Sequence, residues 1–191
     1  MMPRTEEQFK ELRENKKQKI MDSALNLFAE KGFSATSINM IAKKAGISKG
    51  LMYNYFESKE ELITTILNTG FDEFLSVFDS NKDGVLTDKE FVDFIEQTFE
   101  ILKSNLHFWQ IYFHVILQPD VIKLVESKLM EVILPMLTIM TDYFQSKGYE
   151  NPMAYARFFG AMLDGVSMNY IADPEGFPLD EVKKIIINKI I

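Results

Sequence analysis

The residues best suited to chemistry lie between Ser37 and Phe56, where two short segments with apolar faces are separated by Gly46. In the second segment, helical spacing turns Met52 and Phe56 inward and leaves a polar and aromatic set outside. That set consists of Ser48, Lys49, Gly50, Leu51, Tyr53, Asn54 and Tyr55. Lysine suits a guanine edge or a phosphate, leucine suits a thymine methyl, and tyrosine and asparagine suit phosphates. These residue types predict contact with the major groove of DNA.

Two short helices joined by a tight turn would position these side chains. Thr36 or Ser37 can cap the first helix and Ser48 the second, because a hydroxyl accepts the unpaired N–H groups of an opening turn. Gly46 suits the turn, because glycine takes positive φ without steric cost. This arrangement is typical of a helix-turn-helix. A helical hairpin without DNA contacts is the alternative, although packing alone does not require Lys-Gly followed by Tyr-Asn-Tyr.

Helical periodicity continues through the rest of the chain, and strand-like alternation is absent. Five of the six prolines fall at the ends of periodic segments or between them, where they stop helices, and Pro135 lies within the periodic segment 119–146. We expect helices over residues 16–31, 37–45, 48–56, 58–78, 87–104, 106–117, 119–146, 152–172 and 178–190. The sequence therefore predicts an all-α fold, in which a small N-terminal bundle leads into a larger helical body.

The formal net charge of the 191-residue chain is −7, but the charge is unevenly distributed. Residues 1–56 carry ten Lys and Arg against six Asp and Glu, which leaves eleven against twenty-two in residues 57–191. A basic N-terminal third on an acidic body concentrates phosphate attraction at one end. The chain has no cysteine, which excludes disulfides and thiol catalysis. Without a long apolar run or the apolar core of a signal peptide, we expect a cytoplasmic protein.

Residues 16–65 resemble the TetR family of bacterial transcriptional repressors. The resemblance is carried by Gly32-Phe33, Ser37, Ile41-Ala42, the run from Ala45 to Gly50, Tyr53 to Phe56, and Ser58 to Leu62. It implies DNA contacts from Thr36, Ser37, Lys49, Tyr53, Asn54, Tyr55 and Lys59. Leu51 departs from the small hydroxyl residue common in the family, so the base preference at that step does not carry over.

The resemblance also implies three parts: an N-terminal extension over 1–15, the helix-turn-helix domain over 16–60, and an effector-binding and dimerisation domain over 61–191. The body would enclose an apolar effector cavity, for which we expect a lining of Trp109, Tyr112, Phe113, Met136, Met140 and Met162. Such walls favour a hydrophobic effector, although these side chains can equally form core. Helices over about 153–173 and 179–191 would pair two subunits, so that a homodimer reads a palindromic operator.

Residues 79–90 read DSNKDGVLTDKE and fit the twelve-residue calcium loop of an EF-hand. The ligands would be Asp79, Asn81, Asp83, the Val85 carbonyl, Thr87 directly or through water, and Glu90. Gly84 permits the sharp turn that this loop needs. A polar turn with solvated carboxylates is the alternative, since EF-hands usually occur in pairs and the chain has one such loop.

The sequence thus predicts a DNA-binding regulator, most simply a repressor released from double-stranded DNA by a small hydrophobic effector and modulated by calcium. It requires no cofactor, with calcium as an optional ligand. The alternative is a calcium-responsive helical binding protein whose helix-turn-helix is vestigial. We expect no enzyme, because no Ser-His-acid spacing, HExxH motif or phosphate-cradling glycine loop occurs.

Overall fold

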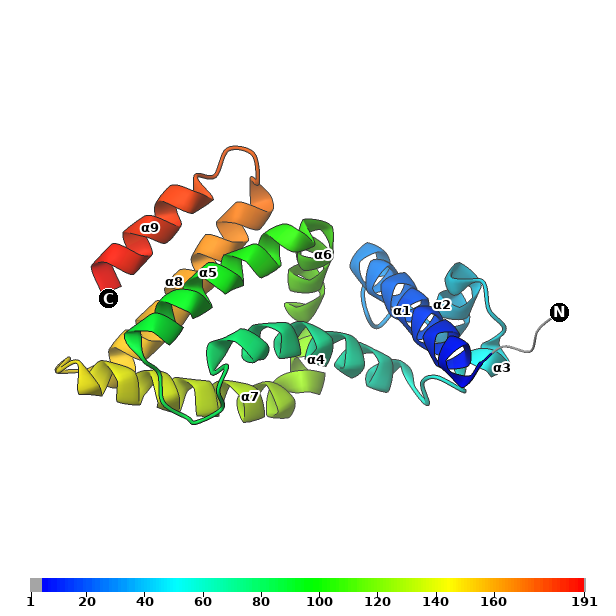
Figure 1. Cartoon of the computed structure of the whole chain (residues 1–191). Helices are drawn as coiled ribbons and strands as arrows, with labels where there is room; N and C mark the ends of the chain where they lie inside the picture. The colour runs from blue at the N-terminus through cyan, green and yellow to red at the C-terminus, as the bar shows by residue number, and fades with distance from the viewer. Residues whose placement is uncertain (1–4, 191) are drawn as a thin grey trace. The chain divides into compact units, whose positions relative to one another are not determined.

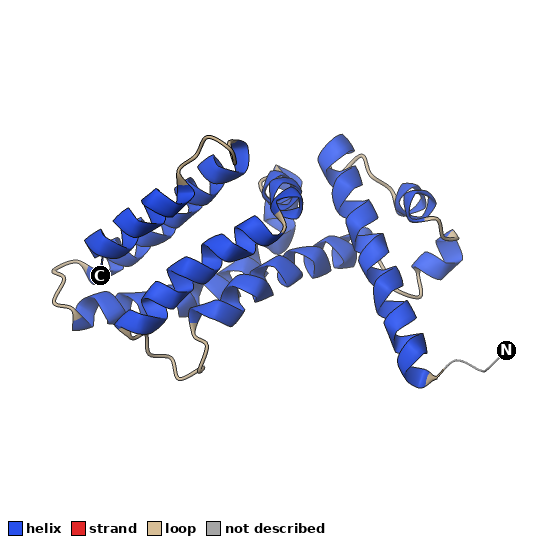
Figure 2. Ribbon diagram, turned by 45° about the horizontal axis from the view of Figure 1, so that its top comes forward, coloured by secondary structure: helices blue, strands red, loops and turns tan. Residues whose placement is uncertain are grey.

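The computed structural model describes residues 5–190, and within that range every regular element is a helix (Figure 2). The helices are α1 (Glu6–Lys31), α2 (Ile38–Ala45), α3 (Lys49–Met52), α4 (Lys59–Phe78), α5 (Asp88–Ser104), α6 (Leu106–Ile116), α7 (Pro119–Ser146), α8 (Pro152–Ala172) and α9 (Leu179–Ile190). The all-α prediction is confirmed. None of the helices among residues 5–190 is both long enough and apolar enough to cross a membrane.

Helix α1 begins ten residues earlier than the expected 16–31, so residues 6–15 of the expected N-terminal extension are helical and continuous with the first helix of the bundle. Thr5 and Gln8 form a capping box, with the Thr5 hydroxyl accepting the Gln8 N–H at 3.3 Å and the Gln8 side chain accepting the Thr5 N–H at 3.2 Å. Glu6 and Glu7 in the first turn complement the positive end of the helix dipole. A helix start is therefore encoded well upstream of the first buried residue, Ile20.

Helix α3 is shorter than the expected 48–56 and ends at Met52. The chain then tightens into turns, because the N–H of Asn54 donates to the Leu51 carbonyl and that of Tyr55 donates to the Met52 carbonyl, each three residues back. Tyr53, Asn54 and Tyr55 therefore lie in a tight turn directly after α3.

Two compact units make up the chain. The first contains residues 1–69 and 111–125, and its core includes Ile20, Phe28, Ile41, Met52 and Leu62, all fully buried. Within this unit α2 and α3 lie on one side of α1 (Figures 1 and 2). The unit takes in more of the chain than residues 16–60, because the α6–α7 corner packs with it. The Gln118 side chain in that corner accepts the Phe33 N–H at 2.9 Å.

The second unit contains residues 70–110 and 126–191, and α5 packs against α8 and α9 within it (Figure 1). Phe91 is the centre of its aromatic core, with ring centroids 4.7 Å from Tyr143, 5.8 Å from Phe144 and 4.6 Å from Phe159. Trp109 is fully buried and donates its indole N–H to the Ile101 carbonyl at 3.0 Å. Large aromatic contacts of this kind supply much of the apolar burial that stabilises a helical domain.

Candidate nucleic-acid interface

Helices α2 and α3 and the turn between them form a helix-turn-helix with both helix starts capped. The Ser37 hydroxyl accepts the Met40 N–H at 3.3 Å, and the Ser48 hydroxyl accepts the Leu51 N–H at 3.1 Å. Gly46 has φ 71° and ψ 35°, the left-handed conformation that ends α2 by a tight turn. The caps and the glycine turn expected from the sequence are present.

The side chains proposed to meet DNA lie on the accessible side of this motif. Ser37, Ser48, Lys49, Gly50 and Asn54 are exposed, Tyr53 is 47% exposed, and Leu51 and Tyr55 are partly buried. Opposite them Met52 and Phe56 are buried in the core of the unit, as the spacing requires. The exposed group combines a cation, hydroxyls and an amide, which are the groups that bind phosphates and base edges.

Thr36 does not belong to this exposed group. Only 2% of its surface is exposed, and its hydroxyl donates to the carbonyl of Gly32 at 2.8 Å. Its side chain therefore stabilises the connection between α1 and α2, which corrects the expectation of a DNA contact. A resemblance in sequence does not reveal that the Thr36 hydroxyl is already hydrogen-bonded within the unit.

Lys59 is also engaged inside the unit. Its ammonium donates to the carbonyls of Phe33 at 2.8 Å and Thr36 at 3.0 Å, and lies 4.3 Å from the centroid of the Phe33 ring. These bonds fix the start of α4 to the segment that leads into α2. The structure thus gives Lys59 a positioning role in place of the expected phosphate contact.

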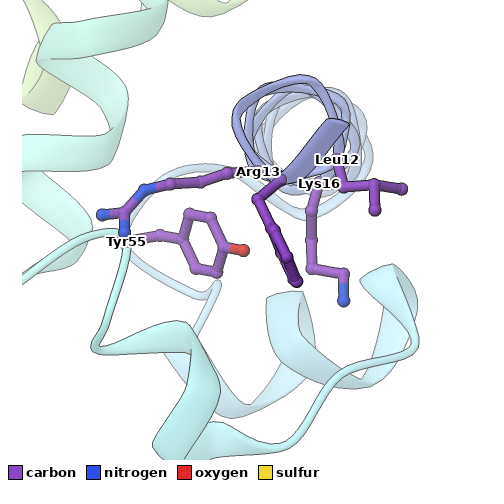
Figure 3. A pocket seen from close by; sticks show the side chains of 5 residues that line it. Leu12, Arg13, Lys16 and Tyr55 are labelled. Carbon is purple, nitrogen blue, oxygen red and sulfur yellow. The ribbon is translucent and has the colours of Figure 1, made fainter. Parts of the chain in front are cut away.

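Sequence reasoning missed a group of α1 residues next to the end of the motif. An open groove of about 470 Å³ is lined by Phe9, Leu12, Arg13, Lys16 and Tyr55 (Figure 3). Arg13 donates to the Asn54 carbonyl at 3.5 Å and its guanidinium lies 5.5 Å from the centroid of the Tyr55 ring. The spacing of Phe9, Leu12, Arg13 and Lys16 continues the helical period of Ile20, and this was the available signal.

The six residues expected to line an effector cavity are divided between the two units. Tyr112 and Phe113 belong to the first, and the Tyr112 hydroxyl donates to the Leu67 carbonyl at 2.9 Å. Trp109, Met136, Met140 and Met162 belong to the second. Trp109, Tyr112 and Met140 are buried, while Phe113, Met136 and Met162 are partly buried. A cavity lined by all six stays a prediction.

The loop between α4 and α5 has several features of the expected calcium loop. Gly84 has φ 75°, and its N–H donates to Asp79 Oδ2 at 3.0 Å, which closes the turn. The other Asp79 oxygen, Oδ1, is buried without a hydrogen-bond partner among residues 5–190.

The carboxylates of that loop, however, are bonded to groups of the loop itself, and the Asn81 amide donates to both Asp83 and Glu90. Glu90 Oε2 accepts the N–H and hydroxyl of Thr87 at 2.9 and 2.7 Å, in the capping box of α5. Glu90 Oε1 accepts from the amide of Asn81 at 2.9 Å. Across the described residues, no group of three or more His, Asp or Glu is arranged to hold a metal ion. The ligand set of Asp79, Asn81, Asp83, Val85, Thr87 and Glu90 is therefore not assembled in this arrangement.

Directly after the loop, Asp88 connects α5 to the end of α7. Its carboxylate contacts the Lys147 ammonium at 2.5 Å and accepts the Tyr143 hydroxyl at 2.9 Å. The hydrogen bond from Lys147, followed by that from Tyr143, lowers the pKa of Asp88. Burial, and then the bond to Asp88, raise the pKa of Tyr143. The calcium-type loop thus ends in a fixed polar contact within the second unit.

Comparison with known proteins places the helix-turn-helix in a family. The sequence model described as "Bacterial regulatory proteins, tetR family" matches residues 20–66. YuxN of Bacillus subtilis, an uncharacterized HTH-type transcriptional regulator, is 48% identical over 58 residues, which cover 30% of this chain and 20% of YuxN. IcaR of Staphylococcus epidermidis, a negative transcriptional regulator of the biofilm operon icaADBC, is 34% identical over 67 residues, covering 35% of this chain and 36% of IcaR.

The similarity in fold extends further than the similarity in sequence. The transcriptional regulator FadR from Bacillus subtilis, in a crystal structure with stearoyl-CoA, is 19% identical, with a TM-score of 0.68 over 90% of this chain and 95% of that one. The chain thus spans less than half the length of the curated relatives it matches, in the region of the helix-turn-helix, while solved structures share the fold over about 90% of the chain. Residues 20–66 thus match the tetR family of bacterial regulatory proteins, and the whole chain shares its fold with solved transcriptional regulators.

Proposed function

We propose that the chain is a DNA-binding transcriptional regulator, acting as a homodimeric repressor on a palindromic operator. The observation that carries this proposal is the exposed group of Ser48, Lys49, Tyr53 and Asn54, presented by a helix-turn-helix whose two helices are both capped. Lys49 and Asn54 supply charged and amide donors for phosphates or base edges, and Tyr53 supplies a hydroxyl. The negative regulator IcaR, similar over the same region, supports repression as the direction of control.

Exposed apolar side chains on the last two helices support the homodimer. On α8 these include Met153, Phe158 and Met168, with Phe158 58% exposed, and on α9 Ile185 is 59% exposed. Buried neighbours such as Phe159 and Ile186 already complete the core of the second unit. The outward apolar residues are thus available for a second copy, and two-fold pairing would present two motifs to the two halves of a palindrome.

A small hydrophobic effector is the proposed release signal. The body contributes buried Trp109 and Met140 and partly buried Met136 and Met162, which favour an apolar ligand. The fold relative FadR is described with bound stearoyl-CoA, and this supports a ligand with a long apolar part. Binding would weaken DNA affinity if the effector prefers a body conformation that separates the two motifs.

Calcium is proposed as a second ligand that modulates the regulator, bound by the loop of residues 79–90. Its support is the buried and unpartnered Oδ1 of Asp79 within a loop that Gly84 already closes. Binding would require Glu90 to leave the Thr87 cap, so we expect modest affinity. Calorimetric titration of calcium into the protein tests this: heat that is lost in Asp79→Asn but kept in Asp93→Asn supports the site. The absence of heat at millimolar calcium removes it.

DNA binding is tested with a duplex that the wild-type protein selects from a random-sequence pool. Lys49→Ala and Tyr53→Ala should each weaken binding about tenfold or more, while Lys31→Ala, at the far end of α1, should not. Calcium binding without any affinity for DNA at low salt would favour the alternative function, a calcium-responsive protein with a vestigial motif.

A further inference from the structure

The first part of α1 serves no visible purpose in the core. Residues 6–19 precede the part of the chain that the family matches, and all of them are exposed except Lys17, which is partly buried. Phe9 is 58% exposed and Leu12 is 45% exposed. A segment of this length adds roughly 20 Å of helix at 1.5 Å per residue. The capping box at Thr5 and the continuity with the packed part of α1 hold this exposed stretch as a helix.

Charges on this segment are sorted onto two faces. A rotation of about 100° per residue places Arg13, Lys16 and Lys17 on the face that also carries Phe9 and Leu12. The same rotation places the acidic residues Glu7, Glu11 and Glu14 on the opposite face, while Glu6, in the first turn, is the one acidic residue on the side of Arg13 and Lys17. The net charge of the segment is small, but one face is basic and the other is acidic. Only the basic face suits an anionic partner.

That basic face lies beside the end of the helix-turn-helix. Arg13 contacts the Asn54 carbonyl at 3.5 Å and the Tyr55 ring at 5.5 Å from its centroid, and the Lys17 ammonium lies 6.0 Å from the centroid of Phe56. Figure 3 shows the Tyr55 ring with the Arg13 guanidinium on one side and Lys16 on the other. The Tyr55 hydroxyl points away from the Arg13 guanidinium, and the two cations therefore lie on either side of the tyrosine side chain in one open groove of about 470 Å³.

We propose that this groove is a second DNA contact, in which Arg13 and Lys16 bind the sugar-phosphate backbone beside the phosphate held by Tyr55. The charge of the face fits a polyanion, and the exposed Phe9 and Leu12 can pack against the apolar faces of deoxyribose. Residues 9–17 would thereby lengthen the footprint of each motif without reading bases. This inference rests on the proposed function, because it assumes that α3 and the turn after it lie on DNA.

The test compares two double variants that lose the same charge. Arg13→Gln with Lys16→Gln removes both cations from the groove, and glutamine preserves helix propensity. Lys31→Gln with Lys123→Gln removes two exposed cations of the same unit that do not line the groove. Each full-length variant is titrated by fluorescence anisotropy against the duplex selected by the wild type, over a series of salt concentrations, with far-UV circular dichroism to check the fold.

We expect the groove variant to bind more weakly and to lose salt dependence. Each lost phosphate contact lowers the slope of log K against log salt by about 0.9, so the change is about two per protomer. The control variant should keep the wild-type slope. Equal slopes for the two variants would overturn the inference and leave the proposed function standing. A changed base preference in the groove variant would also overturn it, because backbone contacts carry no sequence information. Failure of the wild type to bind any duplex at low salt is the separate result that refutes the proposed function.

Discussion

The Gln118 side chain donates a hydrogen bond to the Phe28 carbonyl at 2.9 Å, although the two residues are 90 positions apart in the sequence. Its amide oxygen accepts the N–H of Phe33 at the same distance. One side chain thereby bridges the end of α1 and the loop that leads into α2. The α6–α7 corner is thus held to α1 and to the loop before α2 within the first unit, and residues 70–110 and 126–191 belong to the second unit.

Gln118→Ala should destabilise the first unit. The partly buried Phe33 N–H loses its Gln118 partner, while the Phe28 carbonyl keeps the Gly32 N–H, and one unsatisfied buried polar group costs about 1–3 kcal/mol of unfolding free energy. Urea unfolding followed by circular dichroism measures the loss. Gln110→Ala, which removes an exposed amide bonded to the Ile171 carbonyl, is the control and should cost less than about 0.5 kcal/mol. Equal losses in the two variants would mean that the Gln118 bridge adds nothing.

Replacing Lys59 should affect stability, whereas replacing Lys49 should affect DNA affinity. Lys59→Ala should lower the unfolding free energy by about 1–3 kcal/mol, because its ammonium is bonded to the carbonyls of Phe33 and Thr36. Lys49→Ala should leave stability unchanged, because Lys49 is exposed, and should weaken DNA binding. Thermal unfolding and anisotropy titration of both variants give the comparison. A Lys59→Ala protein of wild-type stability with weaker DNA binding would restore the phosphate contact first expected for Lys59.

Acid should remove the contribution of Asp88. Its pKa in the folded protein lies below the ordinary value of 3.8, because Lys147 and Tyr143 favour the carboxylate. The contribution is therefore complete above about pH 3.8 and is lost as the pH falls through the lower folded value. Asp88→Asn should be less stable than the wild type at neutral pH, and the difference should shrink as the pH falls below 3.8 and close below the folded pKa. Asp142→Asn, at an exposed site on α7, controls for the loss of a charge. A difference that persists unchanged in acid would contradict this role of the carboxylate.

The exposed apolar residues of α8 should be required for dimerisation. Phe158→Glu places a charge on a side chain that is 58% exposed, so it should not disturb the core of the unit. We expect sedimentation analysis to show a shift from dimer toward monomer and DNA affinity to fall with it. Phe9→Glu, an equally exposed phenylalanine in the first unit, is the control for oligomeric state. A dimer that survives Phe158→Glu unchanged would place the interface elsewhere.

Most of the helix boundaries could be predicted from the sequence, because local signals encode them. Proline begins α7 and α8, and capping residues begin α2, α3 and α5, so these starts were expected to within one residue. The start of α1 was missed, because residues 6–19 have no buried stripe and periodicity is the main helical signal.

The errors at individual residues arise from contacts distant in sequence. Thr36 and Lys59 have the types that suit a phosphate, but Leu27 and Phe33 carbonyls occupy their polar atoms. The role of Gln118 depends on partners 85 and 90 positions away, which no local pattern reveals. Residue type predicted which side chains can bind DNA, while tertiary contacts decided which of them are available.

The measurement that tests the account most directly is selection of DNA from a random-sequence pool by the purified protein, followed by titration of the selected duplex against salt. The account predicts a palindromic sequence bound by one dimer, with affinity that falls steeply as salt rises and that weakens in Lys49→Ala. Recovery of no preferred sequence, together with no binding at low salt, would contradict it.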